Sequence, residues 1–377
     1  MSIDFQVAVI GAGITGASLA AQLASQGLDV ALIDQGSPAS RGASAYSGGL
    51  IRLYDRDPLL MEMTARALKA MAGPVFTSAY AGALRQSGVL YRAGLEQQLA
   101  LDMAIERYAS ADYPMHRVQG YGPYKARADR ADLFEARACT ADVRQITARL
   151  CGLVRQQGLV LEHCQVQDID WQADGSACLS LTGERLRCRL LVLACGAWTT
   201  GLLPQLDLQT RAIPLARVLT DQDWSLPVID APTASYAIAL SGHIVQSGCE
   251  PRDRASLPEE LAGPDARHML DACQRISHLR PQAKARVLDI LPGFDCYSAD
   301  GRPVLGFVDD TRALYVATGM SGVGFKFAPA VAEIAAEQIG RYLSGVTSEP
   351  EPRWRGLSVR RALLTRGAEQ RSGSHGA

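Results

Sequence analysis

The chain has 377 residues, of which 47% are hydrophobic and 20% charged, and its formal net charge is −1. This length exceeds what one simple core needs, so we expect two domains. The balanced charge excludes the strong positive field that nucleic-acid binding requires. No apolar stretch is long enough to span a bilayer, and the first strand begins without a signal-peptide pattern. The nine cysteines contain no C-x-x-C pair and are expected to be reduced, which indicates a cytoplasmic protein.

The most informative pattern lies at the N-terminus. An apolar strand is followed by a glycine-rich turn, a small-residue helix that stops at a glycine, and a second apolar strand (7–10, 11–16, 17–24 and 30–33). Gly11 permits the tight turn, Gly13 admits a pyrophosphate close to the backbone, and Gly16 lets the helix lie near the sheet. Asp34 ends the second strand, eighteen residues after Gly16, where it can accept from a ribose hydroxyl. Together these features predict a βαβ dinucleotide-binding unit.

The residues after Asp34 continue the alternation of apolar strands and helices. A Ser/Gly-rich passage at 37–49 has many backbone N–H groups that can reach a ligand, and it leads to Arg52. Apolar periodicity predicts helices at 58–72 and 142–157, a strand at 159–161, and another opening at Val166. A hairpin through Gly175 and Gly183 leads to a buried strand at 190–194. The carboxyl end of that strand is expected to meet the ligand.

Residues 84–135 and 213–294 show short strands, prolines and mixed charge, with a helix around 266–279. We therefore predict an α/β fold. It comprises a Rossmann-type, glutathione-reductase-like dinucleotide-binding domain that is discontinuous in sequence, and an α+β substrate domain on an antiparallel sheet. The dinucleotide-binding domain is assigned to 1–80, 140–212 and 295–345, and the substrate domain to 81–139 and 213–294. Residues 346–377 are expected to form a partly disordered C-terminal extension.

The last third contains a second glycine-rich loop. A turn at 300–306 and a strand at 314–318 precede Gly319-Met-Ser-Gly-Val-Gly324, and Pro329 predicts the start of a helix that runs to 343. Glycine loops at both ends of the chain are more than one NAD needs, so they favour FAD. The helix would point its positive end at the pyrimidine side of the flavin. Lys326 would supply a cation there or bind a substrate carboxylate.

In motif order, residues 5–345 resemble the D-amino-acid oxidase superfamily, especially its monomeric sarcosine oxidase and glycine oxidase-like branches. The resemblance is carried by the opening unit, the passage ending in Arg52, the 190–198 segment, 300–306, and Gly319–Lys326. It implies that Arg52 and Lys326 bind the substrate carboxylate. The expected cofactor-binding residues are Gly11, Gly13, Ile14, Thr15, Gly16, Asp34, Gln35, Arg41, Ala43, Ser44, Ser47, Gly48, Gly49, Val166, Ala194, Cys195, Gly196, Trp198, Gly319, Met320, Gly322, Val323, Gly324, Phe325 and Lys326.

The chain departs from this pattern at four positions. Val323 replaces a histidine of the sarcosine oxidase branch, and Gln246 stands near the lysine that promotes reaction with oxygen. Gly293 replaces the cysteine that binds flavin covalently, and Cys296 is expected to be an ordinary buried thiol. Dissociable FAD is therefore expected. Asp295 replaces an arginine of the glycine oxidase-like enzymes, which counts against a glycine-oxidase assignment.

The resemblance implies oxidation of the C–N bond of an amino acid or N-substituted amino acid by hydride transfer to flavin N5, giving an imine that can hydrolyse. The alternative is a flavin-bearing subunit of a hetero-oligomeric amine or amino-acid dehydrogenase that uses an acceptor other than oxygen. An FAD-binding protein without turnover is a third class. Aromatic hydroxylases and disulfide reductases are disfavoured by their missing motifs, and no metal-ligand spacing is present. His116, His243 and Tyr236 are candidate pocket residues, although a structural role is the default for each.

Overall fold

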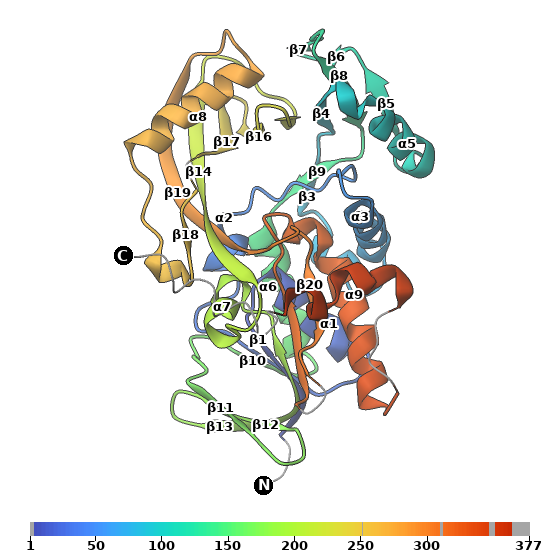
Figure 1. Cartoon of the computed structure of the whole chain (residues 1–377), viewed down its shortest axis with the longest axis vertical. Helices are drawn as coiled ribbons and strands as arrows, with labels where there is room; N and C mark the ends of the chain where they lie inside the picture. The colour runs from blue at the N-terminus through green and yellow to red at the C-terminus, as the bar shows by residue number, and fades with distance from the viewer. Residues whose placement is uncertain (1–3, 251, 310–311, 347–350, 364–377) are drawn as a thin grey trace, which may run out of the picture.

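The computed structural model describes residues 4–250, 252–309, 312–346 and 351–363. Within these ranges two large sheets carry the fold, and each has its own packing layers (Figure 1). The predicted α/β class, with a Rossmann-type sheet and a second, mainly antiparallel sheet, is confirmed.

The first sheet has eight strands among the described residues, and its centre is parallel. Its main path runs β10 (Leu159–Leu161), β2 (Val30–Ile33), β1 (Phe5–Ile10), β13 (Arg185–Leu193), β12 (Ala177–Ser180) and β11 (Asp168–Trp171), while β21 (Leu314–Thr318) pairs with β13 and with β20 (Val304–Phe307). The strand expected to open at Val166 begins two residues later. The expected hairpin is the antiparallel run from β11 to β13.

Apolar side chains cover both faces of this sheet. On one face Val7 and Val9 pack against helices α1 (Ile14–Ser25), α3 (Pro58–Met71), α6 (Val143–Arg155) and α9 (Gly324–Leu343). On the other face Ala8 packs with residues of the β11–β13 run and of β21. Such near-continuous apolar strands are typical of a parallel sheet buried on both sides. Because α1 is rich in alanine, α9 can pack closely against it (Figure 1).

The second sheet has nine strands within the described ranges and is antiparallel except where β15 pairs with β4. Its path runs β18 (Arg254–Ala255), β14 (Leu208–Thr220), β17 (Ile244–Gly248), β16 (Ser235–Ser241), β15 (Val228–Asp230), β4 (Val89–Gly94), β8 (Arg130–Glu135) and β5 (Met115–Val118), and β19 (Ala285–Ser298) pairs with β14. Helix α8 (Ala266–Leu279) packs on one face of this sheet, and α5 (Gln98–Tyr108) lies beside β5. The domain boundaries expected at 212/213 and 294/295 fall inside β14 and β19.

The remaining described elements are short. They are the strand pairs β3 (Leu84–Gln86) with β9 (Cys139–Ala141) and β6 (Gly120–Tyr121) with β7 (Tyr124–Lys125), the helices α2 (Gly42–Tyr46), α4 (Thr77–Tyr80) and α7 (Thr199–Leu202), and 3-10 turns at Leu95–Gln97, Gly196–Trp198, Pro258–Glu260, Pro352–Leu357 and Val359–Ala362. In the last two turns Trp354 and Val359 are buried against the first sheet's layers. Residues 347–350 and 364–377 of the extension expected to be partly disordered lie outside the described residues.

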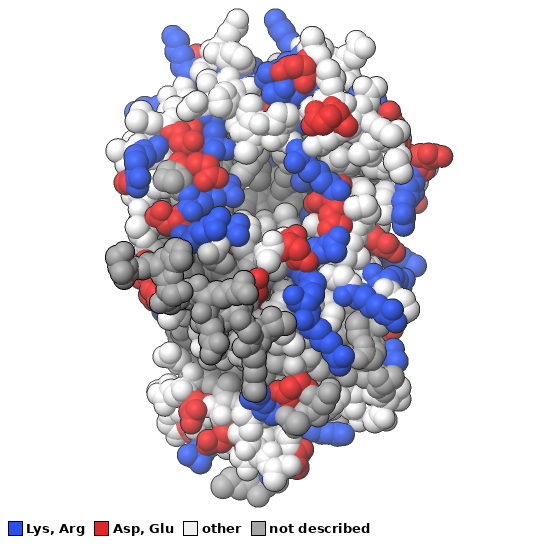
Figure 2. Space-filling model, viewed as in Figure 1, with Lys and Arg blue, Asp and Glu red and all other residues white. Residues whose placement is uncertain are grey.

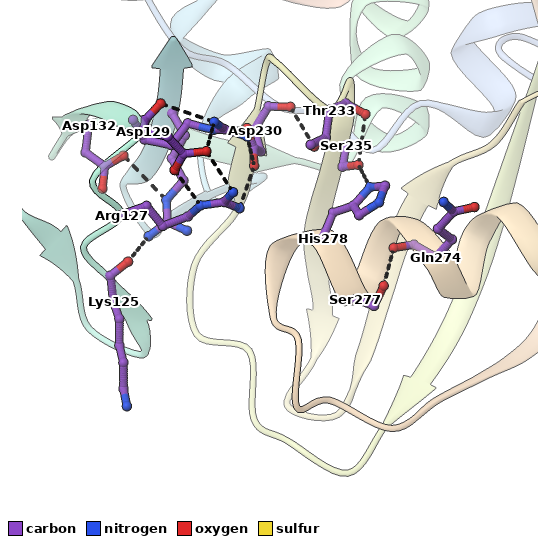
Figure 3. A network of polar contacts seen from close by, with 12 residues as sticks. Lys125, Arg127, Asp129, Asp132, Asp230, Thr233, Ser235, Gln274, Ser277 and His278 are labelled. Carbon is purple, nitrogen blue, oxygen red and sulfur yellow. Dashed lines mark hydrogen bonds and ion pairs between the residues drawn. The ribbon is translucent and has the colours of Figure 1, made fainter. Parts of the chain in front are cut away.

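A network of charged side chains joins strand β8 and the loop before it, residues 126–135, to the rest of the second sheet (Figure 3). This segment is called the β8 arm. Asp230, at the end of β15, is fully buried and accepts from Arg130 Nε at 2.9 Å and from Arg127 Nη1 at 3.5 Å. Arg92 and Asp132 form a second buried ion pair between β4 and β8. Because a buried charge is costly without a partner, these pairs hold the two strands and the adjoining loop in one arrangement.

Over the face shown in Figure 2, basic and acidic side chains are interspersed, in keeping with the net charge of −1. Among the described residues, no helix combines the length and apolar character needed to cross a membrane.

Candidate active site

The N-terminal glycines make a close backbone cradle between β1 and α1. A Cβ at Gly16 would lie 1.9 Å from the Gly11 carbonyl oxygen, and a Cβ at Gly11 would lie 2.5 Å from the Ala194 carbonyl oxygen. Gly11 also has φ of +104°, a conformation that favours glycine. The turn therefore presses α1 against the carboxyl ends of β1 and β13, and Gly13 lines the cavity beside Ser44, whose Oγ would lie 3.2 Å from a Cβ at this position.

Two polar side chains complete this end of the site. Ser44 Oγ, on α2, accepts from the Ile14 N–H at 3.0 Å and so satisfies one donor in the first turn of α1. The Asp34 carboxylate accepts from Ala12 N–H at 2.6 Å and from Gly36 N–H at 2.8 Å. Burial raises the pKa of Asp34. These donors hold the carboxylate at the end of β2, where further lone pairs remain to accept from a ligand hydroxyl.

A cavity of about 670 Å³ begins at this cradle and extends to the second glycine loop. Every predicted cofactor-binding or catalytic residue except Gly16 lines it. Gly16 instead lies behind Gly11, in the packing position expected from the motif. The cavity thus connects residues near both ends of the chain.

The second sheet supplies the opposite wall through its period-two alternation. Ile213 and Leu215 of β14, Tyr236 and Ile238 of β16, and Gln246 of β17 face the cavity. Their neighbours Ala216, Val218, Ala237 and Val245 pack under α8 instead. Tyr236 is therefore a wall residue, whereas His116 and His243 are exposed and lie outside the cavity lining.

The predicted start of the last helix is wrong. Helix α9 begins at Gly324, so Pro329 is its sixth residue and Lys326 lies in its first turn. A proline there removes only a bond to the Phe325 carbonyl, and Phe325, Phe327 and Ala328 pack in the core, which keeps this turn helical. Consequently the first N–H groups of α9, which have no carbonyl partner within the helix, begin at Gly324, the last residue of the second glycine loop.

Lys326 is buried and paired with a residue that the sequence did not reveal. Its Nζ lies 3.0 Å from Asp55 Oδ2, and its side chain is 4% exposed. Burial and the charge of Arg52 lower the pKa of Lys326 to about 8, against the opposing effect of Asp55. Although burial alone would raise the pKa of the Asp55 carboxyl, Lys326 and Arg52 lower it below its usual value. The pair is therefore held in its charged form near neutral pH.

Arg52 has an unsatisfied donor. Its guanidinium lies 5.1 Å from the centre of the Tyr91 ring, and its buried Nη1 finds no hydrogen-bond partner among the described residues. The backbone next to it is fixed by Glu135 of β8, which accepts from Leu53 N–H at 2.6 Å and Tyr54 N–H at 3.0 Å. A buried donor without an acceptor is unfavourable, so this position is suited to an anionic ligand.

Sequence reasoning also missed part of the β19 wall. Gly293, Asp295 and Tyr297 line the cavity, together with Phe294 between the first two, and the period-two rule applied from Gly293 would have found Tyr297. Cys296 points away and is fully buried beside Thr318, and burial raises the pKa of its thiol to about 12. Asp55 and Glu135 had no local signal, because each meets its partner far along the chain.

The residues present fit a bound dinucleotide with a second large head group. The cradle glycines have no space for a Cβ, Gly13 and Asp34 line the cavity at the ends of β1 and β2, and the cavity continues to the second glycine loop. A ligand that filled only one end of the cavity would contact only one of the two glycine loops.

Comparison with known proteins agrees with this architecture. The chain is 22% identical to the glycine oxidase of Geobacillus kaustophilus, over 90% of this chain and 94% of that protein. It is 23% identical to a tRNA 5-methylaminomethyl-2-thiouridine biosynthesis bifunctional protein of Polaromonas naphthalenivorans, over 88% of this chain, and it spans only 56% of that relative's length. The L-proline dehydrogenase of P. horikoshii superposes with a TM-score of 0.78 at 17% identity, over 92% of this chain and 95% of that one.

The model of one protein family matches residues 6–338. This match covers both glycine loops, both sheets and the cavity between them. The chain therefore belongs to the DAO family of FAD-dependent oxidoreductases.

Proposed function

We propose that the protein oxidises the C–N bond next to the carboxylate of an amino acid or N-substituted amino acid, giving an imine that can hydrolyse. The observation that carries this proposal is the unsatisfied Nη1 of Arg52 in a cavity that Lys326 also lines. A planar guanidinium with an open donor and a neighbouring ammonium suit a carboxylate. The glycine oxidase and L-proline dehydrogenase similarities support the same substrate class.

Each side chain has a defined task in this proposal. Arg52 and Lys326 bind the carboxylate and so fix the orientation of the neighbouring carbon. Asp55 holds the Lys326 ammonium, and Glu135 holds the backbone after Arg52 by accepting from the N–H groups of Leu53 and Tyr54. The apolar side chains of Ile213 and Ile238 exclude water from the reacting bond.

The glycine cradle, Asp34, Ser44 and the Gly319–Gly324 loop would hold FAD, which supplies a hydride acceptor when bound. We propose that this cofactor is not attached covalently. Gly293 lines the cavity where the sarcosine oxidase branch carries its attachment cysteine, and Cys296 faces away from the cavity.

The nine free cysteines also support a reducing, cytoplasmic location.

A second candidate is a flavin-bearing dehydrogenase subunit that passes electrons to an acceptor other than oxygen. Gln246 lies on the cavity wall, and its Nε2 donates to the Tyr46 carbonyl at 3.1 Å. A neutral amide therefore stands where the resemblance places the lysine that assists reaction with oxygen. Comparing turnover with oxygen and with a dye acceptor separates the two candidates.

The proposal is tested by anaerobic flavin reduction across D-, L-, N-methyl and cyclic amino acids. We expect bleaching by at least one of them. Arg52→Ala and Lys326→Ala should retain FAD but lose about 100-fold or more in the reduction rate at low substrate, because a buried charged hydrogen bond is worth about 3 kcal/mol. Lys69→Ala, at an exposed position on α3, serves as the control. Wild-type reduction rates in both cavity variants would refute the carboxylate clamp.

A further inference from the structure

The proposed chemistry leaves one buried carboxylate on the cavity wall unused. Asp295 lies on β19, is 6% exposed and lines the cavity. Its Oδ1 accepts from Cys296 N–H at 2.7 Å, and its Oδ2 accepts from Gly322 N–H at 2.8 Å. Among the residues that the structure describes, no basic side chain forms an ion pair with it. Asp295 is thus a carboxylate held by neutral donors alone.

Arg211 and Arg252, which come from the strand paired with β19 and from the cavity wall, are engaged elsewhere. Arg211 is the cross-strand neighbour of Asp295, but its guanidinium lies 4.6 Å from the centre of the Tyr297 ring and its Nε donates to Gln209 at 3.0 Å. Arg252, on the cavity wall, is paired with Glu250 at 3.1 Å. Burial raises the pKa of Asp295 to about 6, and no charged side chain offsets that burial.

A buried carboxylate without a cation is energetically unfavourable, and a ligand can remove that cost. Each carboxylate oxygen has two lone pairs, so the two backbone bonds leave acceptor positions for a group in the cavity. Tyr236 lines the same wall, and aromatic faces also attract cations. Together these features describe a binding position for positive charge.

The position is separate from the carboxylate clamp. Arg52 lies over the Tyr91 ring of β4 and Lys326 binds Asp55, whereas Asp295 is on β19 and accepts from the N–H groups of Cys296 and Gly322. The α-amino group of an amino acid is on the carbon next to its carboxylate, so it would stay near the clamp. A cation that reaches Asp295 must therefore lie further along the substrate.

We propose that Asp295 determines substrate specificity by binding a positively charged group on the substrate's side chain. This inference rests on the proposed function and narrows its substrate class to amino acids whose side chain carries an amine or a guanidinium. The clamp then binds one end of the substrate, and Asp295 binds the other.

The test uses the FAD-loaded protein with its flavin reduced beforehand by dithionite, so that binding is measured by calorimetry without turnover. The ligands are the pairs lysine and norleucine, and arginine and citrulline, in both enantiomers. We expect at least one cationic ligand to bind the wild-type protein 10-fold or more tightly than its neutral counterpart. Asp295→Asn should reduce that ratio to about one, while Asp289→Asn, on the same strand but outside the cavity lining, should preserve it.

Two results would overturn the inference. The first is that the wild-type protein binds the cationic and the neutral ligand of each pair equally tightly. The other is an Asp295→Asn variant that weakens both members of a pair equally, which would mean that Asp295 only holds the Gly322 loop. Anaerobic reduction with the same ligands keeps the two proposals distinguishable. Cationic preference without any reduction would contradict the proposed function alone, and reduction without cationic preference would contradict this inference alone.

Discussion

At the scale of single residues, the site depends on how buried charges are paired. Lys326 has a direct carboxylate partner in Asp55, whereas Arg52 has an open donor and rests on the Tyr91 ring. This difference assigns the two cations different parts in carboxylate binding. Arg52 offers planar, directional donors, and Lys326 offers a point charge whose protonation depends on its neighbours.

The protonation of Lys326 predicts a pH dependence. Its pKa is lowered to about 8, so the ammonium loses its proton as the pH rises through that value. The Kd of a carboxylate without an amine, such as propionate, should therefore be constant near pH 7 and increase above about pH 8. Titration of the flavin spectrum measures it. Lys326→Arg should move the increase to higher pH.

Asp55 supplies a second test of the same electrostatics. Its negative charge raises the pKa of Lys326, so Asp55→Asn should lower that pKa further and bring the weakening of propionate binding to lower pH. The same titration series measures the shift. An unchanged pH profile in this variant would show that Asp55 does not control the charge of Lys326.

At the scale of elements, the glycine turn determines how closely α1 approaches the sheet. Gly16→Ala places a Cβ 1.9 Å from the Gly11 carbonyl oxygen, which is a backbone atom, so α1 must shift. We expect loss of FAD retention together with a lower unfolding temperature. Gly152→Ala in α6 is the matched control, because its Cβ meets nothing within 4 Å and should stabilise the helix by roughly 0.5–1 kcal/mol. Equal behaviour of the two variants would contradict this explanation.

The charged network on the β8 arm makes a separate prediction. Asp230→Asn removes the carboxylate that faces Arg130 and Arg127 and should destabilise the protein by about 3 kcal/mol, as expected when a buried pair loses one partner. Chemical denaturation followed by tryptophan fluorescence measures the change. Asp129 contacts the same arginines from an exposed position, so Asp129→Asn should change the free energy of unfolding little. If both substitutions are equally mild, the network does not hold this arm.

The sequence predicted those elements whose signals are local. The strand, glycine turn, helix and Asp34 follow one another within thirty residues, and α8 was predicted at its observed bounds. The start of α9 was missed because Pro329 is a stronger start signal than Gly324, while the packing of Phe325 and Phe327 that overrides it is tertiary. The Lys326–Asp55 pair joins residues 271 positions apart, and no periodicity reports such a contact.

At the scale of the whole molecule, the cavity brings together segments from Ile10 to Lys326. The first sheet supplies the cradle and the second sheet supplies the apolar wall, with β14 and β19 running from beside α8 toward the first sheet (Figure 1). Because the cavity lining is dispersed along the chain, it exists only in the folded state. Any ligand that fills it should therefore couple to global stability.

That coupling yields the last prediction. Free FAD at 100 times its Kd should stabilise the folded protein by about 2.7 kcal/mol, so the unfolding temperature should rise with FAD concentration. FMN and AMP each occupy only one end of the cavity and should stabilise less at equal concentration. Since Gly293 provides no thiol on the cavity wall, acid precipitation should release the yellow colour into the supernatant. Flavin that stays with the precipitate would show a covalent bond, and an unfolding temperature indifferent to FAD would mean that the two glycine loops do not share one cofactor.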